Sequence, residues 1–279
     1  MKKIGAKILY PQHISSYDKK RLKSITIYPI INEILVYWVG KVDTSLGQNL
    51  IGLYLFGSLT YGDFVHTRSD IDLMAVVKKP LSSAEMEKIK QLHQNIEEKF
   101  PEWKGRVECS YLPKTLINEL LPPKQTRPYF GGGAWYDEAD YGNEWLINQF
   151  FLYNNSISLF GPEYKLLMTV PPDIREVQKA CIRDLLCEWK PKINDSQWLE
   201  NSHYQSYLVL NLCRILYTVH NAKMGSKKFA AMWVKKTFPE WHALIEEAEA
   251  WDYDKEMRQQ EKASAFIQFA IWNVSGVNF

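Results

Sequence analysis

The sequence predicts an α/β domain followed by an all-α helical domain, and three observations support this. Apolar runs of strand length occupy residues 53–56 and 73–77, and residues 106–112 alternate between apolar and polar side chains. The C-terminal part shows helical periodicity and no convincing strand. The helices predicted there span residues 173–189, 203–221, 226–237 and 240–274. We therefore expect one domain over residues 1–160 and a second over residues 161–279.

Helices are also expected on both sides of the first two strands. Residues 1–18 have no sustained period and predict an irregular segment, whereas apolar residues at spacings of three and four predict an amphipathic helix over residues 25–42. After the second strand, Pro80 ends the apolar run. Ser83 is then placed to cap a charged helix that ends near Phe100.

Residues 113–145 predict a long loop, because several prolines and a run of three glycines interrupt regular structure. A loop of this length in a compact domain usually has a binding role. It carries Trp135, Asp137 and Glu138, and an aromatic ring beside carboxylates suits a polycationic, hydroxyl-rich small molecule. A solvated loop anchored by one Trp is an equally good interpretation of the same residues.

Composition limits the function classes. The 279 residues are 46% hydrophobic and 14% aromatic, which is ample for two domains. A net charge of +2 argues against a long polyanionic partner. The four cysteines show no CxxC spacing, so we expect reduced thiols and a cytoplasmic location. No segment has the length and composition of a signal-peptide core or a membrane span. We expect a soluble monomer that binds neither nucleic acid nor a membrane.

The segment between the first two strands combines a glycine–serine turn with two carboxylates. Gly57 can adopt backbone angles closed to other residues and lets a phosphate approach the main chain, and Ser58 adds a hydroxyl donor. Asp70 and Asp72 are two residues apart, so strand geometry places both side chains on one face. Such a pair favours a hard divalent cation such as Mg²⁺, which shares its oxygen ligands with substrate phosphates. The alternative is that both are surface acids.

Glu108 lies in the third predicted strand. Val107, Cys109 and Tyr111 form the apolar face of that strand, and Glu108 and Ser110 point to the other face. Single acids on strands are common, so an ordinary exposed glutamate is the alternative to a catalytic one.

These motifs resemble a known family. Gly-Ser, eleven residues and then Asp-x-Asp between two strands is similar to the signature of the polymerase-β-type nucleotidyltransferases, which move a nucleoside monophosphate from a triphosphate onto an acceptor. Residues 155–162, 210–217 and 227–233 are similar, in order and spacing, to the streptomycin/spectinomycin adenylyltransferases within that group. The resemblance covers about residues 50–255 with a gap in the middle loop, and it implies a nucleotidyltransferase domain with a mixed sheet.

The resemblance also implies roles for single residues. Glu108 matches a third carboxylate that acts as general base, metal ligand or both. Arg214 and Lys227 match an Arg and a Lys of the helical domain that reach the ATP phosphates, and Tyr253 matches an aromatic residue beside the nucleotide. The implied site has Asp70, Asp72 and Glu108 as catalytic residues and as ligands of two Mg²⁺ ions, with Gly57, Ser58, Ser69, Arg214, Lys227 and Tyr253 binding ATP. A helix-face salt bridge is the alternative for Arg214, and a solvated helix start for Lys227.

The implied activity is transfer of AMP from ATP to a hydroxyl of an aminoglycoside of the streptomycin or spectinomycin type, which would confer antibiotic resistance. The chain departs from the family where the drug would bind. The family's Gly-Glu-Trp segment is replaced by residues 133–135, and its acids before the Arg-bearing helix lack clean equivalents. Trp189 and Glu200 are candidates for the missing ring and charge. The choice of antibiotic therefore stays open.

A second function is also compatible with the helical segment. Arg214 and His220 form an Arg-x5-His pattern on one predicted helix, which resembles the catalytic pair of HEPN-type RNases. Such helical domains accompany nucleotidyltransferases in toxin–antitoxin systems, where the target is a protein or an RNA. Against this interpretation, six residues is not the closest helical alignment, and a lone His on a helix is more often structural.

Overall fold

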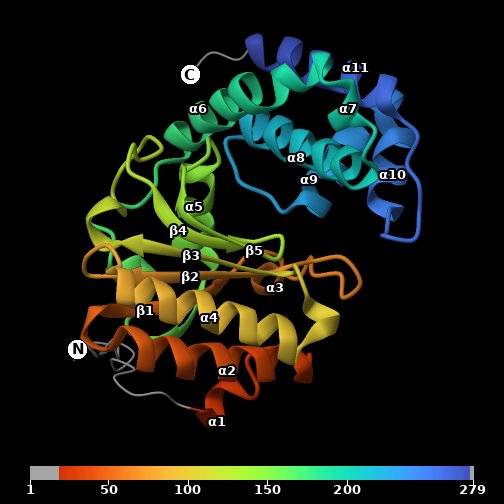
Figure 1. Ribbon diagram of the computed structural model, residues 1–279. Coiled ribbons are helices and arrows are strands. Elements are labelled where there is room, and N and C mark those ends of the chain that lie inside the picture. Colours follow the sequence, from red (N-terminus) through yellow and green to blue (C-terminus); the bar gives the residue numbers. More distant parts are fainter. Residues whose placement is uncertain (1–18, 277–279) are drawn as a thin grey trace, which may run out of the picture.

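A six-stranded mixed sheet forms the first part of the protein in the computed structural model, which describes residues 19–276 (Figure 1). The strand order is β5-β4-β3-β2-β1-β6, and within it only β2 and β3 pair in parallel. The strands are β1 (Leu50–Phe56), β2 (Ile71–Val77), β3 (Val107–Pro113), β4 (Arg127–Gly131), β5 (Ala134–Ala139) and β6 (Ile157–Phe160). The predicted mixed sheet is thus confirmed.

The two faces of the sheet belong to different cores. Helices α2 (Pro29–Leu46) and α4 (Ser83–Lys99) cover one face, where they bury Leu55 and Leu73 (Figure 1). Side chains of the opposite parity, such as Tyr54 and Met74, join a second core with α5 (Trp145–Asn155) and the C-terminal helices. Because successive strand residues alternate in direction, this assignment also fixes which face each polar strand residue occupies.

Two helix boundaries differ from the predicted ones. The first long helix begins at Pro29, whose fixed backbone angle suits the first helical position, rather than at residue 25. The cap of α4 is Ser82 rather than Ser83, because the Ser82 hydroxyl accepts from the Glu85 N–H while the Glu85 carboxylate accepts from the Ser82 N–H. Two short helices, α1 (Lys19–Leu22) and α3 (Ser58–Tyr61), complete this region. The predicted irregular segment 1–18 lies outside the described residues.

The prediction of a long loop over residues 113–145 was wrong for its second half. Strands β4 and β5 form an antiparallel hairpin there, with Phe130 paired to Trp135. Gly132 and Gly133 have φ of 59° and 75°, so these glycines build the turn of the hairpin rather than end the structure. The Phe130 ring stacks on buried His93 of α4 at 4.3 Å, which anchors the hairpin to the α2/α4 face.

The C-terminal part is an all-α bundle above the sheet, as predicted (Figure 1). Its helices are α6 (Ile174–Asp184), a π-helical turn (Leu185–Trp189), α7 (Ser196–Leu199), α8 (Ser202–Asn221), α9 (Lys227–Thr237), α10 (His242–Ala250) and α11 (Gln260–Ser275). The helix expected over residues 240–274 is therefore two helices. Ser202 holds the segment between them, since its hydroxyl accepts from the Met257 N–H.

Three further observations concern the chain as a whole. Strand β6 is the last strand described, and a domain boundary at residue 160 stays a prediction. Within residues 19–276, no helix has both the length and the apolar character needed to cross a membrane. The four thiols are free, with Cys109, Cys181 and Cys213 buried and Cys187 exposed.

Gly161, after β6, gives a test of the sheet edge. Its φ is +79°, and a Cβ there would overlap the carbonyl oxygen of Ile51 and lie 2.9 Å from the Cα of Gly52. We expect Gly161→Ala to lower the free energy of unfolding by at least about 2 kcal/mol, because backbone strain and backbone overlap add. Gly47 is the matched control, with φ +46° and no atom within 4 Å, so its Ala variant adds backbone strain without overlap and should lose less stability. Equal losses in urea unfolding would contradict this account.

Candidate active site

The glycine–serine turn and the Asp pair meet at the C-terminal end of β1. Gly57 has φ +69°, and a Cβ there would overlap Oδ2 of Asp72 and lie 2.6 Å from its Cγ. Only glycine therefore lets the Asp72 carboxylate lie across the turn. Ser58 follows as the first residue of α3. The structure thus brings together two motifs that are separated by eleven residues in the sequence.

The register of β2 and β3 brings the third carboxylate beside this pair. Asp72 is the direct partner of Glu108 in the parallel ladder, so both side chains leave the same face of neighbouring strands. That face is the one turned toward the helical bundle, because Met74 and Leu112, two and four residues further along the strands, lie in the bundle's core. On β4, the Tyr129 phenol forms a side-chain hydrogen bond with Glu108.

Burial and mutual repulsion raise the pKa of all three carboxylates. Burial, followed by the charge of Glu108, raises the pKa of Asp70 to about 7. The same two causes, with Asp70 added, raise the pKa of Asp72 well above its usual value. Burial also raises the pKa of Glu108, against the hydrogen bond from Tyr129 and the charge of Lys227. The site therefore favours any cation that relieves this repulsion.

The donor set fits a hard divalent cation. Three carboxylates supply only oxygen ligands, and such a cation would lower the pKa values that burial raises. Among residues 19–276, no group of three or more His, Cys, Asp or Glu side chains is already gathered in metal-binding geometry.

Two cationic residues approach from the helical bundle. Lys227 is the first residue of α9, and its Nζ lies 4.2 Å from the centre of the Tyr207 ring. Burial and the charge of Arg214 lower the pKa of Lys227 to about 7, although the charges of Asp72, Asp70 and Glu108 raise it.

Arg214, on α8, donates to Oδ1 of Asn211 at 2.8 Å and lies 5.6 Å from the Phe151 ring centre. Its charge acts on Asp72 as well as on Lys227. The structure thus places both predicted phosphate-binding cations opposite the carboxylates.

Tyr253 and Ser69 occupy the rim of this site. Tyr253 is exposed, its ring lies 5.7 Å from that of His203, and the charge of Asp70 raises its pKa after the effect of burial. The Ser69 hydroxyl accepts from the Val65 N–H at 3.0 Å, so it stabilises its own loop.

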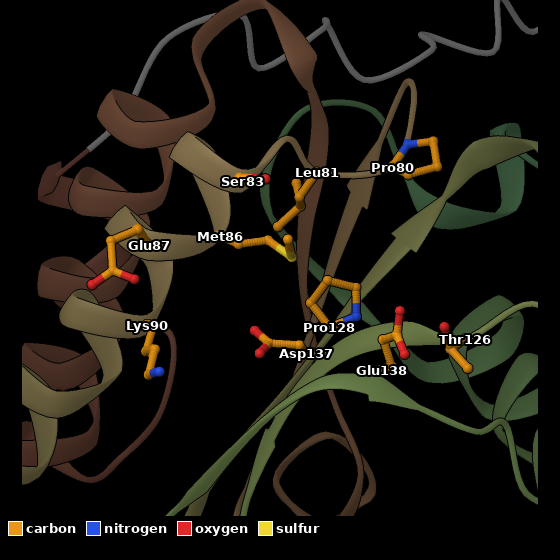
Figure 2. Close-up of a pocket in the computed structure, with 10 residues that line it drawn as sticks. All are labelled: Pro80, Leu81, Ser83, Met86, Glu87, Lys90, Thr126, Pro128, Asp137 and Glu138. Atoms are coloured by element: carbon orange, nitrogen blue, oxygen red, sulfur yellow. The ribbon is translucent and has the colours of Figure 1, made fainter.

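The structure does not bring Trp135 and Asp137 to the carboxylates. Both lie on the α2/α4 face, where the Trp135 ring is 6.0 Å from those of His93 and Tyr111 and its Nε1 donates to Asp137 at 2.7 Å. Asp137 and Glu138 line an open depression between β5 and α4, together with Met86 and Lys90 (Figure 2). Trp135 packs on the side of the sheet opposite Glu108, and the substrate role expected for these three residues stays a prediction.

The other two substrate candidates lie in the bundle. Trp189 is buried, its Nε1 donates to Asp184 at 2.8 Å, and its ring is 5.8 Å from that of Tyr207. Through Tyr207 it adjoins Lys227. Glu200 is exposed and lines a separate depression between α7 and α11, with residues such as Ser264 and Gln268. Trp189 therefore stays a candidate, whereas Glu200 has no contact with the site.

Two site residues were missed by sequence reasoning. Tyr129 went unnoticed because residues 113–145 were interpreted as loop, although the alternation from Arg127 to Phe130 fits a strand. Asp184 ends α6, and burial raises its pKa to about 6. The charges of Glu144 and Arg214 act on it, which places it near Arg214 of the candidate site. The position of Asp184 in a predicted helix gave no indication that it lies near the site.

Comparison with known proteins agrees with this arrangement. A nucleotidyltransferase domain model matches residues 41–127, and a model described as the C-terminal domain of aminoglycoside adenylyltransferase matches residues 174–271. The first segment contains the glycine–serine turn and the three carboxylates, and the second contains Arg214, Lys227 and Tyr253. The two matches together support the aminoglycoside adenylyltransferase family for this chain. It is a nucleotidyltransferase.

Relatives and a solved structure are consistent with this family. Curated sequences named spectinomycin 9-adenylyltransferase, from Staphylococcus aureus strains Mu50 and N315, are each 28% identical to this chain over 221 residues. The match covers 73% of this chain and 78% of each relative. A crystal structure of spectinomycin adenyltransferase AAD(9) from Enterococcus faecialis, with ATP and spectinomycin, has a TM-score of 0.67 at 17% identity. It covers 86% of this chain and 98% of that one, which supports the shared fold.

The raised pKa of Asp70 in this adenylyltransferase fold makes a stability prediction. Its folded value of about 7 lies above the unfolded value near 4, so the folded state binds more protons between these pH values. Stability therefore falls as the pH rises from about 4 to about 7. We expect Asp70→Asn to raise the free energy of unfolding at pH 8 by roughly 1–3 kcal/mol, allowing for partial exposure.

Urea unfolding of the ligand-free protein at pH 5 and pH 8 measures this effect. Asp254 is exposed, and Asp254→Asn is a matched control that should leave stability unchanged at both values. An Asp70→Asn protein that is less stable than the wild type at pH 8 would contradict the electrostatic account.

Proposed function

We propose that the protein transfers AMP from ATP to a hydroxyl of an aminoglycoside-type antibiotic, with spectinomycin as the first candidate, and thereby confers resistance. One observation carries this proposal: Asp72 and Glu108 are aligned on the sheet face opposite Lys227 and Arg214. This arrangement suits a nucleoside triphosphate, whose phosphates need cations on one side and metal-bridging carboxylates on the other. The names of the curated relatives supply the choice of spectinomycin.

In the mechanism, the residues of the chain orient the triphosphate and the acceptor. Lys227 and Arg214 hold the phosphates from the bundle, and the Gly57-Ser58 turn holds them from the sheet. Asp70 and Asp72 would hold the Mg²⁺ ions, which would supply charge neutralisation at the phosphates. Tyr253 lies where it can flank the nucleotide.

Glu108 is placed to remove the proton of the attacking hydroxyl. The hydroxyl oxygen then attacks the α-phosphorus in line with the departing pyrophosphate. The Tyr129 hydrogen bond keeps the Glu108 carboxylate oriented for this step. We infer that the protein acts as a monomer in the cytoplasm, where ATP is available and thiols stay reduced.

A thermal-shift screen followed by product analysis tests this function. ATP with Mg²⁺ should raise the Tm, and spectinomycin should raise it further, because each ligand binds the folded state. Mass spectrometry should then detect an AMP adduct of the antibiotic and released pyrophosphate. Streptomycin and further aminoglycosides serve as parallel acceptors. If no acceptor in the panel is adenylylated by a protein that binds ATP, the proposed acceptor class is wrong.

The pH profile tests Glu108 as the general base. Burial raises its pKa above the usual 4.5, so kcat/KM should fall as the pH is lowered through that raised value, where the base becomes protonated. Glu108→Gln should lower kcat by about a factor of 100 or more and abolish this acidic limb, with ATP affinity largely kept. A loss of ATP affinity instead would make Glu108 a metal ligand rather than a base.

Arg214 and His220 separate adenylyl transfer from the RNase alternative. No contact joins these two side chains in the described structure: Arg214 is held by Asn211, whereas His220 is exposed beside Trp233. Arg214→Ala should weaken ATP binding by about tenfold or more, and His220→Ala should leave adenylylation nearly unchanged. Metal-independent RNA cleavage that is lost in both variants would establish the alternative.

A further inference from the structure

The loop between α3 and β2 binds the helical bundle at two helix ends. This loop, residues 62–70, follows the glycine–serine turn and ends at Asp70. Its side chains contact the start of α9 through Asp63 and the end of α10 through Thr67 and Arg68. Chemistry at the site described above uses none of these three side chains.

Arg68 caps the C-terminal end of α10. Its guanidinium donates to the carbonyl oxygen of Glu249 at 2.8 Å and also to those of Ala248 and Trp251. The last turn of α10 contains no basic residue, so the partial negative charge of its final carbonyls is met from outside the helix. Lys255 donates to the Ala250 carbonyl oxygen at 2.7 Å, and Arg68, from the α/β part of the chain, binds the neighbouring carbonyls.

Asp63 has the complementary place at the N-terminal end of α9. Its Oδ2 accepts from the Lys228 N–H at 3.0 Å. The first turn of α9 has no acidic residue and begins with Lys227 and Lys228, so this positive helix end lacks an anion of its own. Beside Arg68, the Thr67 hydroxyl donates to Asp252 at 2.5 Å. One loop therefore places an anion at the positive end of one helix and a cation at the negative end of another.

The same loop is fixed on the side of the sheet. Arg106, which precedes β3, donates to the carbonyl oxygens of His66 at 2.7 Å and Ser69 at 2.5 Å. Within the loop, the Ser69 N–H donates to the Val65 carbonyl at 2.8 Å. The loop is thus a fixed connection between the carboxylate strands and the bundle.

The two capped helix ends carry residues of the proposed ATP site. Lys227 is adjacent to the residue that Asp63 contacts, and Tyr253 follows Trp251 by two positions. We propose that Asp63 and Arg68 form an interdomain clamp that positions Lys227 and Tyr253 over the carboxylates. Both are positioning residues, and the identification of the nucleotide as ATP rests on the proposed function. Without the clamp, the two parts of the chain would be held by fewer polar contacts and would sample open arrangements.

Titration calorimetry with ATP and Mg²⁺, without acceptor, is the first test. Asp63→Ala and Arg68→Ala should each raise the Kd for ATP roughly five- to tenfold, and Arg68→Lys should give a smaller rise because it keeps the charge but loses the fork of donors. Asp173→Ala removes a helix cap remote from the loop, and Arg258→Ala removes an exposed guanidinium. Both controls should keep the wild-type Kd. An unchanged Kd in both clamp variants would overturn the proposal.

A double-mutant cycle distinguishes positioning from a general loss of stability. If Asp63 acts through Lys227, then Asp63→Ala should add no further loss of ATP affinity in a Lys227→Met background. Its effect on Tm should be the same in both backgrounds, because the cap on α9 is lost either way. An equal rise of Kd in both backgrounds would overturn the clamp as a positioning device.

A distance measurement tests the clamp independently of ATP and of any acceptor. Cys187 is the one exposed thiol described, and Lys88→Cys on the exposed side of α4 supplies a second spin-label site. Pulsed dipolar spectroscopy should give a narrow distance distribution that broadens in Arg68→Ala and Asp63→Ala but not in Arg258→Ala. Unbroadened distributions in both clamp variants would overturn the clamp. Failure to adenylylate any antibiotic would refute the proposed function and leave this result intact.

Discussion

The structure depends on the electrostatic cost of holding Asp70, Asp72 and Glu108 on one face of the sheet. The parallel register of β2 and β3 makes Asp72 and Glu108 direct neighbours, and burial leaves their repulsion weakly screened. The compensating charges of Lys227 and Arg214 come from the helical bundle. Neither half of the chain therefore forms a balanced site alone, and the placement of the two halves becomes part of the chemistry.

Local periodicity was enough to predict the centre of this site. Side chains alternate between the two faces of a strand, so Asp70 and Asp72 share a face. The same rule placed Glu108 on the face of its strand opposite that of Cys109. Glycine at position 57 was expected to admit a phosphate, and the structure adds that it also leaves room for the Asp72 carboxylate. These features depend on short stretches of chain, so one sequence contains them in full.

The same rule could not place Trp135. Its face depends on the hairpin register, in which Tyr129 pairs with Tyr136 and Phe130 with Trp135. The glycines that predicted a loop instead form the hairpin turn and, at position 131, leave room for the Tyr129 ring. Once β4 is recognised as a strand, parity directs Tyr129 toward Glu108 and sends Trp135 to the opposite core.

Contacts across long sequence separations were beyond prediction. Arg68 binds the end of α10 across about 180 residues of sequence. Neither the loop nor the helix contains a sequence pattern that indicates this contact. The break between α10 and α11 is similar, because the Ser202 hydroxyl that holds Met257 is distant in sequence. Helical periodicity continues through residues 251–259, and tertiary hydrogen bonds override it.

The pKa shifts on the two sides of the candidate site have the same main cause, burial, and opposite directions. Burial raises the pKa of Asp70 to about 7 and lowers that of Lys227 to about 7, so both groups are poised to titrate near neutral pH. A bound triphosphate would raise the pKa of Lys227, and a bound divalent cation would lower that of Asp70. Binding both together lets a proton lost on the sheet side be balanced by one gained on the helical side. The charge that each half lacks in the free protein is thus the charge that the metal–nucleotide complex carries.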